Sequence, residues 1–403
     1  MEEFIFGGEV FQAYTQVSSF SVTDADLKLL LAGVFMPSYP GYKCTRDMLI
    51  LSAEGWDWLP AKKATGPTTY FLGFKLVGAH AIPAVIGSIP GRLLNKDSMN
   101  IFEDHLRVAT NVPIIWRWPE FDGSSASLIP IQELSTENQI VILKIPSVVE
   151  EEDDVVLTKV GHIAKLGMEG ERFTAVRYFD KFAYVVTFEK TDSFYVLDLD
   201  VSNPQVLGKL EITEFSSYLH SLNADNTLLL AIVEEVDAEG QVLGLRFSLF
   251  DTTNPTKPIL LQKYTIEKWK FTLSFPFGTV LWNLKEFQYH ALDVPEVGVL
   301  IIPIQVYAPY PSTTGNFDGF LMYDVSRQGI LLRGGIPHIK SNQFYGCYFN
   351  NYLPQRSFVS NGNVTTVKWY SVMSTDLDTF KNTWELQLDD GVDRGQGCFY
   401  GPY

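Results

Sequence analysis

The chain has 403 residues, of which 46% are hydrophobic and 14% aromatic, with 30 glycines and 21 prolines. Aromatic residues favour strands, and glycine and proline supply turns, so this composition indicates an all-β protein. The net charge of -16 argues against a nucleic-acid backbone or an anionic membrane surface as partner, because binding phosphate groups requires clustered lysine and arginine.

The N-terminal stretch "MEEFIFGGEV" begins with acidic residues, where an export signal would carry basic ones. Its glycines lack a following helical pattern, so a phosphate-binding loop is not indicated. We find no apolar run long enough to span a bilayer as a helix. The sequence therefore predicts no membrane insertion and contains no signal peptide.

An apolar strand followed by a polar turn recurs along the whole chain. Its seven copies are centred on Phe20, Phe74, Leu143, Val196, Leu249, Met322 and Val372. They are spaced about 50 to 75 residues apart, which is near the length of a four-stranded propeller blade with variable loops. In two copies the strand runs into Asp and then Asn-Pro, as in "FYVLDLDVSNPQVLGKLEI" and "FSLFDTTNPTKPILLQKYTI".

The fourth unit shows four strands most clearly. "FTAVRYF" is predicted as the first strand, "FAYVVTF" as the second, "SFYVLDL" as the third and "QVLGKLEI" as the fourth, with polar turns between them. We expect Tyr195, Val196 and Leu197 to be buried in a central strand. A sandwich would show shorter spacing and no phrase recurring at a fixed place in each unit.

The predicted fold is all-β: a β-propeller of four-stranded antiparallel blades, with seven expected and six to eight allowed. Residues 1–403 are predicted to form one propeller domain that is N-terminally incomplete if preceding sequence is missing. Asp198, Asp251 and Asp324 stand where a strand must reverse. Their carboxylates suit turn capping, and a calcium ligand is the competing interpretation.

The stretch from Gly170 to Leu222, "GERFTAVRYFDKFAYVVTFEKTDSFYVLDLDVSNPQVLGKLEITEFSSYLHSL", resembles the family of secreted proteins with a C-terminal beta-propeller domain, distant relatives of WD-repeat proteins. The similarity continues in "SIPGRLLNKDSM", "DGFLMYDVS" and "QRSFVSNGNVTTV". This resemblance implies an extracellular or cell-surface propeller and brings no catalytic residues. Family members usually carry an export signal and further propeller sequence upstream, which this chain does not contain.

A row of polar residues is predicted on the innermost strands. Counting two residues back from the apolar residue before each first turn selects Asn100, Arg177, His220, His290 and Arg356. Residues two apart share a face of a strand, so these side chains are expected to point toward the central channel.

This predicted ring has three interpretations. It is a structural polar lining, a small-anion or polar-ligand site, or a transition-metal site that uses His220 and His290. The two arginines oppose a cation and favour the first two interpretations. Hydrolytic motifs such as a Gly-x-Ser-x-Gly elbow or a His-Glu-x-x-His helix do not occur.

Aromatic residues in the longer insertions are candidates for recognition, because loops of repeat folds commonly carry binding sites. They are Trp56, Trp58, Tyr307 and Tyr310. Such side chains stack on sugars or seat a protein partner, and packing back onto the blades is the alternative. Asn363 begins an Asn-Val-Thr glycosylation acceptor, if the chain follows a eukaryotic secretory route.

Three cysteines, Cys44, Cys347 and Cys398, are too few and too scattered for a zinc motif or a disulfide scaffold, and they allow at most one bridge. No cofactor is predicted. The sequence favours a non-enzymatic extracellular or cell-surface propeller that binds a protein or a carbohydrate through its loops. The alternatives are a propeller-based hydrolase and a metal-binding surface protein with a site at the central channel.

Overall fold

The structure is a computed structural model. It describes residues 13–19, 30–36, 38, 40–56, 67–78, 80–115, 133–146, 156–168, 170–188, 192–212, 218–236, 242–267, 288–292, 297–306, 317–338, 355–368 and 371–388. The chain divides into two compact units, residues 1–213 and 214–403. The single-domain organisation expected for residues 1–403 therefore stays a prediction.

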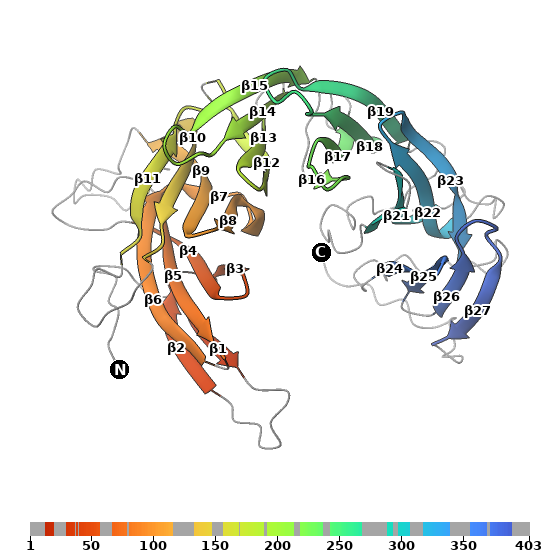
Figure 1. Ribbon diagram of the computed structural model, residues 1–403, viewed down its shortest axis with the longest axis horizontal. Helices are drawn as coiled ribbons and strands as arrows, with labels where there is room; N and C mark the ends of the chain where they lie inside the picture. Colours follow the sequence, from red (N-terminus) through yellow and green to blue (C-terminus); the bar gives the residue numbers. More distant parts are fainter. Residues whose placement is uncertain are drawn as a thin grey trace, which may run out of the picture. The chain divides into compact units, whose positions relative to one another are not determined.

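The described residues of unit 1 form four antiparallel sheets in chain order, which Figure 1 shows side by side along the chain. The first sheet, A, has two strands, and the others have four or five. The strands are β1 (Ala13–Ser19) and β2 (Leu30–Met36) in sheet A; β3 (Gly41–Cys44), β4 (Met48–Trp56), β5 (Pro67–Val77) and β6 (His80–Pro90) in sheet B; β7 (Arg92–Leu93), β8 (Met99–Phe102), β9 (His105–Ile115), β10 (Glu133–Lys144) and β11 (Thr158–Ile163) in sheet C; and β12 (Arg172–Phe179), β13 (Phe182–Phe188), β14 (Asp192–Asp198) and β15 (Gln205–Ile212) in sheet D.

In the described part of unit 2, the strands form three sheets of four strands each. The strands are β16 (Tyr218–Ser221), β17 (Leu228–Val236), β18 (Val242–Asp251) and β19 (Ile259–Glu267) in sheet E; β20 (Gln288–Ala291), β21 (Val297–Val306), β22 (Phe317–Ser326) and β23 (Gly329–Pro337) in sheet F; and β24 (Arg356–Ser360), β25 (Asn363–Lys368), β26 (Ser371–Asp376) and β27 (Asn382–Gln387) in sheet G.

The recurring apolar strand is the third strand of its sheet wherever the sheet is complete. Phe74 lies in β5, Leu143 in β10, Val196 in β14, Leu249 in β18, Met322 in β22 and Val372 in β26. The first copy is centred on Phe20, which lies outside the described residues, and it begins in β1, which pairs with β2 as a third strand pairs with a fourth. Sheet D has the four strands predicted from sequence, and Tyr195, Val196 and Leu197 are buried, as expected.

Each sheet forms from short alternating segments joined by tight turns. Asp180 closes the β12–β13 turn with a φ of 46°, and Gly362 closes the β24–β25 turn with a φ of 72°. Asp and Gly tolerate this left-handed conformation better than β-branched residues do. The described part of the chain contains one helical element, the 3-10 turn η1 (Lys96–Ser98), so the all-β prediction is confirmed.

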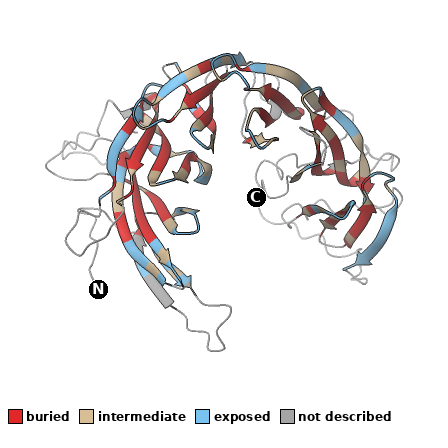
Figure 2. Cartoon of the chain, viewed as in Figure 1, coloured by how far each residue is buried: buried red, intermediate tan, exposed pale blue. Residues whose placement is uncertain are grey.

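Hydrophobic cores lie between the faces of consecutive sheets in each unit. Ile50 and Phe71 of sheet B pack with Leu106 and Val141 of sheet C. Sheets C and D share a second core, and sheets E and F and sheets F and G share two more. Figure 2 shows buried residues concentrated in the middle strands of the sheets, whereas β27 is exposed along its length.

No described helix is long and apolar enough to cross a membrane. The first strands β3, β8 and β12 lie along one edge of the stacked sheets of unit 1, and the fourth strands lie along the opposite edge (Figure 1). This arrangement brings residues from the first strands of separate sheets together.

Candidate functional site

All five residues of the predicted polar row lie on the first strands of their sheets. Asn100 is in β8 and Arg177 in β12 of unit 1, whereas unit 2 contains the other three, His220 in β16, His290 in β20 and Arg356 in β24. The assignment to first strands is therefore correct, and the convergence of all five side chains on one channel stays a prediction.

The polar-row residues do not all stand at the same distance from the first turn of their sheets. Phe102 pairs with His105, and Phe179 pairs with Phe182, so Asn100 and Arg177 stand two residues before the last pair. In sheet G the last pair is Ser360 with Asn363, which leaves Arg356 four residues before it.

Sequence reasoning missed a sixth member of this row. The amide of Thr45 donates to the carbonyl of Met48 at 2.8 Å and closes the β3–β4 turn, so Lys43 stands two residues before that closure. The signal was present in "GYKCTRDM", but β3 is only four residues long and is not strongly apolar.

Asn100 is engaged by the buried guanidinium of Arg107. Its Oδ1 accepts from Arg107 Nε at 3.0 Å and from Nη2 at 2.5 Å. Arg107 Nη1 donates to the carbonyl oxygen of Asp180 at 2.5 Å, which links sheets C and D. Burial lowers the pKa of Arg107 to about 10, and the guanidinium lies 4.5 Å from the ring centre of Phe102. Asn100 and Arg107 thus form part of a hydrogen-bonded contact between sheets C and D.

Arg177 belongs to a separate charge cluster. Its Nη1 lies 3.1 Å from Asp97 Oδ2, and Lys43 Nζ lies 3.9 Å from Asp97 Oδ1. Asp97 is part of η1, which interrupts the first-strand position of sheet C between β7 and β8. One carboxylate thus bridges cations from sheets B and D. The capping sequence "NKDS" was the available sequence signal for η1.

In unit 2, His220 lies among aromatic rings. Its Nδ1 is 3.3 Å from Tyr218 Oη, and its ring meets that of Tyr289 edge-on at 5.7 Å. Burial raises the pKa of Tyr289 to about 12. Among the described residues no group of three or more His, Cys, Asp or Glu side chains is arranged to hold a metal ion.

A buried polar cluster joins sheets F and G. Lys368 Nζ of β25 forms an ion pair with Asp318 of β22, and both side chains are almost fully buried. His338 lies beside them, with Nδ1 2.6 Å from Ser371 Oγ and Nε2 2.8 Å from Thr366 Oγ1. Burial, followed by the nearby Lys368 charge, lowers the pKa of His338 to about 3 despite the opposing effect of Asp318.

The turn aspartates behave as predicted in two of three cases. Asp198 Oδ1 accepts from the amide of Asp200 at 3.1 Å, and Asp251 Oδ1 accepts from the amide of Thr253 at 2.8 Å. These are side-chain caps of turns. Asp324 instead forms an ion pair with Arg333 at 2.9 Å.

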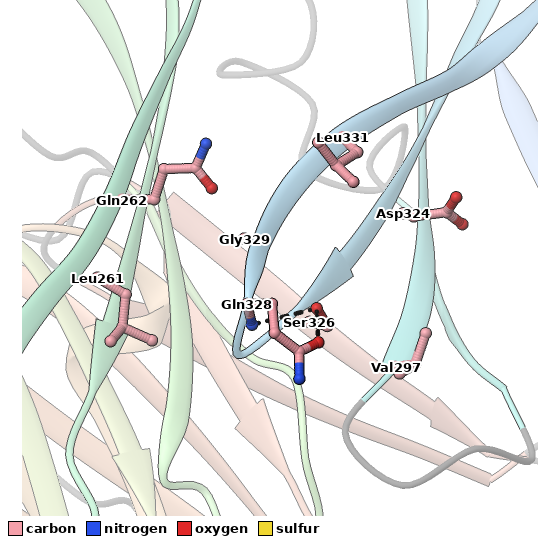
Figure 3. Close-up of a pocket in the computed structure, with 8 residues that line it drawn as sticks. All are labelled: Leu261, Gln262, Val297, Asp324, Ser326, Gln328, Gly329 and Leu331. Atoms are coloured by element: carbon pink, nitrogen blue, oxygen red, sulfur yellow. Dashed lines mark hydrogen bonds between the residues drawn. The ribbon is translucent and has the colours of Figure 1, made fainter.

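A cavity of about 260 Å³ lies in unit 2, lined from β19, from the start of β21 and from the β22–β23 turn (Figure 3). Leu261, Leu331 and Val297 supply its apolar wall, and Gln262 and Asp324 its polar one. Asp324 is paired with Arg333, and Gln262 Oε1 accepts from the amide of Ile330 at 2.7 Å. The principal polar groups of this cavity are thus engaged within the protein.

The two ends of each sheet differ in the connections that leave them. In an antiparallel meander, connections from the second to the third strand and from one sheet to the next leave at the same end. We call this the long-connection end, because five of its connections are long: 57–66, 116–132, 268–287, 307–316 and 338–355. Two long connections, 20–29 and 145–157, leave from the opposite end.

Hydrogen bonds show that these ends coincide for sheets B, C and D of unit 1 and for sheets F and G of unit 2. In unit 1, Thr110 Oγ1 donates to the carbonyl oxygen of Pro90 at 3.0 Å, and the amide of Phe173 donates to Asn111 Oδ1 at 3.1 Å. In unit 2, the contact between His338 and Ser371 joins the same ends of sheets F and G.

Tryptophan follows this asymmetry. Trp58, Trp116, Trp118, Trp269, Trp282 and Trp369 belong to connections at the long-connection end, and Trp56 is the last residue of β4. These are seven of the eight tryptophans of the chain, the eighth being Trp384 in β27.

Trp58, Tyr307 and Tyr310 lie outside the described residues, and of Trp56 only the backbone is described. Asn363 begins β25 and is partly exposed, with its Nδ2 donating to the carbonyl oxygen of Asn361 at 3.1 Å. Its glycosylation stays a prediction.

Of the three cysteines, Cys44 is exposed and free, and Cys347 and Cys398 lie outside the described residues. A disulfide between the latter two is therefore not tested.

Two relatives and one solved structure show what the chain is similar to. A protein of Archaeoglobus fulgidus is 35% identical over 191 residues, which are 47% of this chain and 24% of the relative. A protein of Methanocaldococcus jannaschii, MJ1554, is 30% identical over 216 residues, which are 53% of this chain and 29% of the relative. The matched regions thus span less than a third of these longer proteins.

The periplasmic gluconolactonase PpgL of Pseudomonas aeruginosa is 10% identical, with coverage of 93% of this chain and 95% of that chain and a TM-score of 0.42. The family model for the Beta propeller domain matches residues 3–380, most of the chain. Together with the repeated four-stranded antiparallel sheets, this match shows that the chain belongs to the beta propeller domain family.

Proposed function

We propose that this protein is a non-enzymatic β-propeller scaffold of the cell surface or extracellular space that binds a protein or a carbohydrate through its strand connections. The main support is the concentration of tryptophan in connections at the long-connection end of the sheets. Aromatic side chains in connections give large contact areas at low entropic cost and stack on the apolar faces of sugars.

The sheets supply the rigid frame that such loops need. Their polar inner residues take part in contacts within the protein, as in Asn100 with Arg107 and Arg177 with Asp97. Binding sites on loops gain precision when the elements that carry them are fixed by packing. The extracellular location is supported by the resemblance to secreted propeller proteins.

The test of binding compares the parent with a variant in which Trp58, Tyr307 and Tyr310 are replaced by alanine. Trp384→Ala is the matched control, because Trp384 is 50% exposed and lies in a strand instead of a connection. Both variants and the parent are applied to an array of carbohydrates and an array of extracellular proteins.

We expect the parent to bind a defined class of ligand, the triple variant to lose at least about ten-fold in affinity, and the control to bind as the parent does. A parent that binds nothing on either array, or a triple variant that binds normally, would contradict the proposal. Turnover of a bound carbohydrate would contradict its non-enzymatic part. Surface labelling of intact cells tests the location.

A further inference from the structure

Unit 1 pairs two cationic side chains with one carboxylate at the first-strand edge of its sheets, and a third cation, Lys96, precedes that carboxylate in the chain and acts on the charge of Lys43. Lys43 comes from β3, Lys96 from η1 and Arg177 from β12. Asp97 lies 3.9 Å from Lys43 Nζ and 3.1 Å from Arg177 Nη1. The cluster therefore draws on three consecutive sheets, B, C and D.

The central element of this cluster is held firmly. Asn95 caps η1 through a bond from the Asp97 amide to its Oδ1 at 2.8 Å. Tyr178 Oη of sheet D donates to the carbonyl oxygen of Ser98 at 3.1 Å, and Ser98 is fully buried. Arg177 is oriented as well, since its Nη1 also donates to the carbonyl oxygen of Val176 at 2.9 Å. The charged groups of Asp97 and Arg177 are thus held in position by hydrogen bonds and by packing around them.

Among the residues that the structure describes, the cluster has more positive than negative charge. Asp97 is paired with Lys43 and Arg177, and Lys96 adds a third positive charge, in a protein whose net charge is -16. The pKa of Lys43 is lowered, chiefly by burial and further by the charges of Arg177 and Lys96, although Asp97 acts in the opposite direction. A further anion at this position would relieve repulsion among the cations.

A small anion also has access. The side chains of Lys43, Asp97 and Arg177 are 32%, 22% and 13% exposed, and Lys96 is exposed. Partial burial strengthens charge interactions relative to those on an open surface, because solvent screens the charges less. Arginine and lysine together form the donor set commonly found around phosphate and sulfate groups.

We propose that Lys43, Lys96 and Arg177 bind the oxyanion of a phosphate or sulfate group, with Asp97 pairing with the two strand cations when the anion is absent. The site lies on first strands, so it is independent of the aromatic connections invoked for the proposed function. The anionic group belongs either to a free inorganic ion or to a sulfated or phosphorylated sugar, and the experiment distinguishes these sources.

The experiment titrates the purified full chain calorimetrically with sodium sulfate and with sodium phosphate at constant ionic strength, using sodium chloride as reference. Lys43→Gln and Arg177→Gln are each expected to weaken sulfate binding roughly two- to five-fold. Lys159→Gln removes an exposed cation from β11 in the same unit and should leave sulfate binding unchanged. A second arm compares a monosaccharide sulfate with its uncharged sugar, and tighter binding of the sugar sulfate than of inorganic sulfate identifies the sugar as the source.

Asp97→Asn is expected to change sulfate affinity in the opposite direction. It removes the competing carboxylate, so sulfate should bind roughly two- to five-fold more tightly than to the parent. The proposal is overturned if the parent shows no sulfate or phosphate binding beyond chloride, or if Lys43→Gln and Asp97→Asn both bind sulfate as Lys159→Gln does. These outcomes are independent of the array experiment, because the aromatic variant retains all four charged residues.

Discussion

Lys368 of β25 and Asp318 of β22 form an ion pair between two neighbouring sheets, with side chains that are 1% and 4% exposed. The ammonium also lies 5.6 Å from the ring centre of Phe320. A buried pair gains little over a well-packed apolar pair, but loss of one partner leaves an uncompensated charge in a dry interface.

We therefore expect Lys368→Met to destabilise the protein by about 3 to 5 kcal/mol in urea unfolding monitored by tryptophan fluorescence. The double variant Lys368→Met with Asp318→Leu should recover most of that loss, since it leaves no buried charge. A double variant that is as unstable as the single one would show that the pair has a role beyond charge compensation.

His338 predicts a dependence of stability on pH. Its folded-state pKa of about 3 lies below the ordinary value of 6.5, so between these values the unfolded state binds more protons than the folded state. The stability that His338 contributes is complete above pH 6.5 and is lost as pH falls toward 3, with a slope of up to about 1.4 kcal/mol per pH unit.

His338→Gln should flatten this acid-side loss in unfolding experiments between about pH 7 and 4.5. His80→Gln is the control, because His80 is exposed at the start of β6, and its profile should follow that of the parent. If the unfolding free energy of His338→Gln and that of the parent fall equally steeply with pH, His338 is not the source of the acid-side loss of stability.

Val196 tests the packing of sheet D. It is fully buried in β14, between β13 and β15, and we expect Val196→Ala to cost about 1 to 3 kcal/mol through lost burial and a residual cavity. Val206→Ala in β15 removes the same atoms from a side chain that is 43% exposed, and it should cost less than about 0.5 kcal/mol. Equal effects would mean that burial does not decide the cost.

Gly319 tests the close approach of β22 and β23. A Cβ at this position would collide with the carbonyl oxygen of Ile336, a backbone atom that cannot rotate away. We expect Gly319→Ala to lower the thermal midpoint and to cost about 1 to 3 kcal/mol. Gly41→Ala, where the nearest atom is Ser52 Oγ at 3.2 Å, should be near neutral. An unchanged thermal midpoint for Gly319→Ala would contradict this prediction, because β22 and β23 would then have to move apart at no cost in stability.

The sequence predicted the repeated sheet because its determinants are local. The strands of sheets D and E alternate with turns whose residues favour reversal, and Asp198 in sheet D and Asp251 in sheet E cap turns from within two residues of their partners. In sheets B to F the third strand carries buried apolar residues on both of its faces, so its composition alone marks it out in these repeats. These features do not depend on how the sheets are placed in space.

The candidate site depended on contacts between sheets. The sequence placed Arg177 on a first strand, but not beside Asp97, because η1 interrupts the regular strand and brings a distant carboxylate to it. Lys368 and Asp318 are 50 residues apart and share no motif. Charge pairing, burial and pKa depend on distance in three dimensions, so only the stacking of the sheets decided which ionisable groups meet.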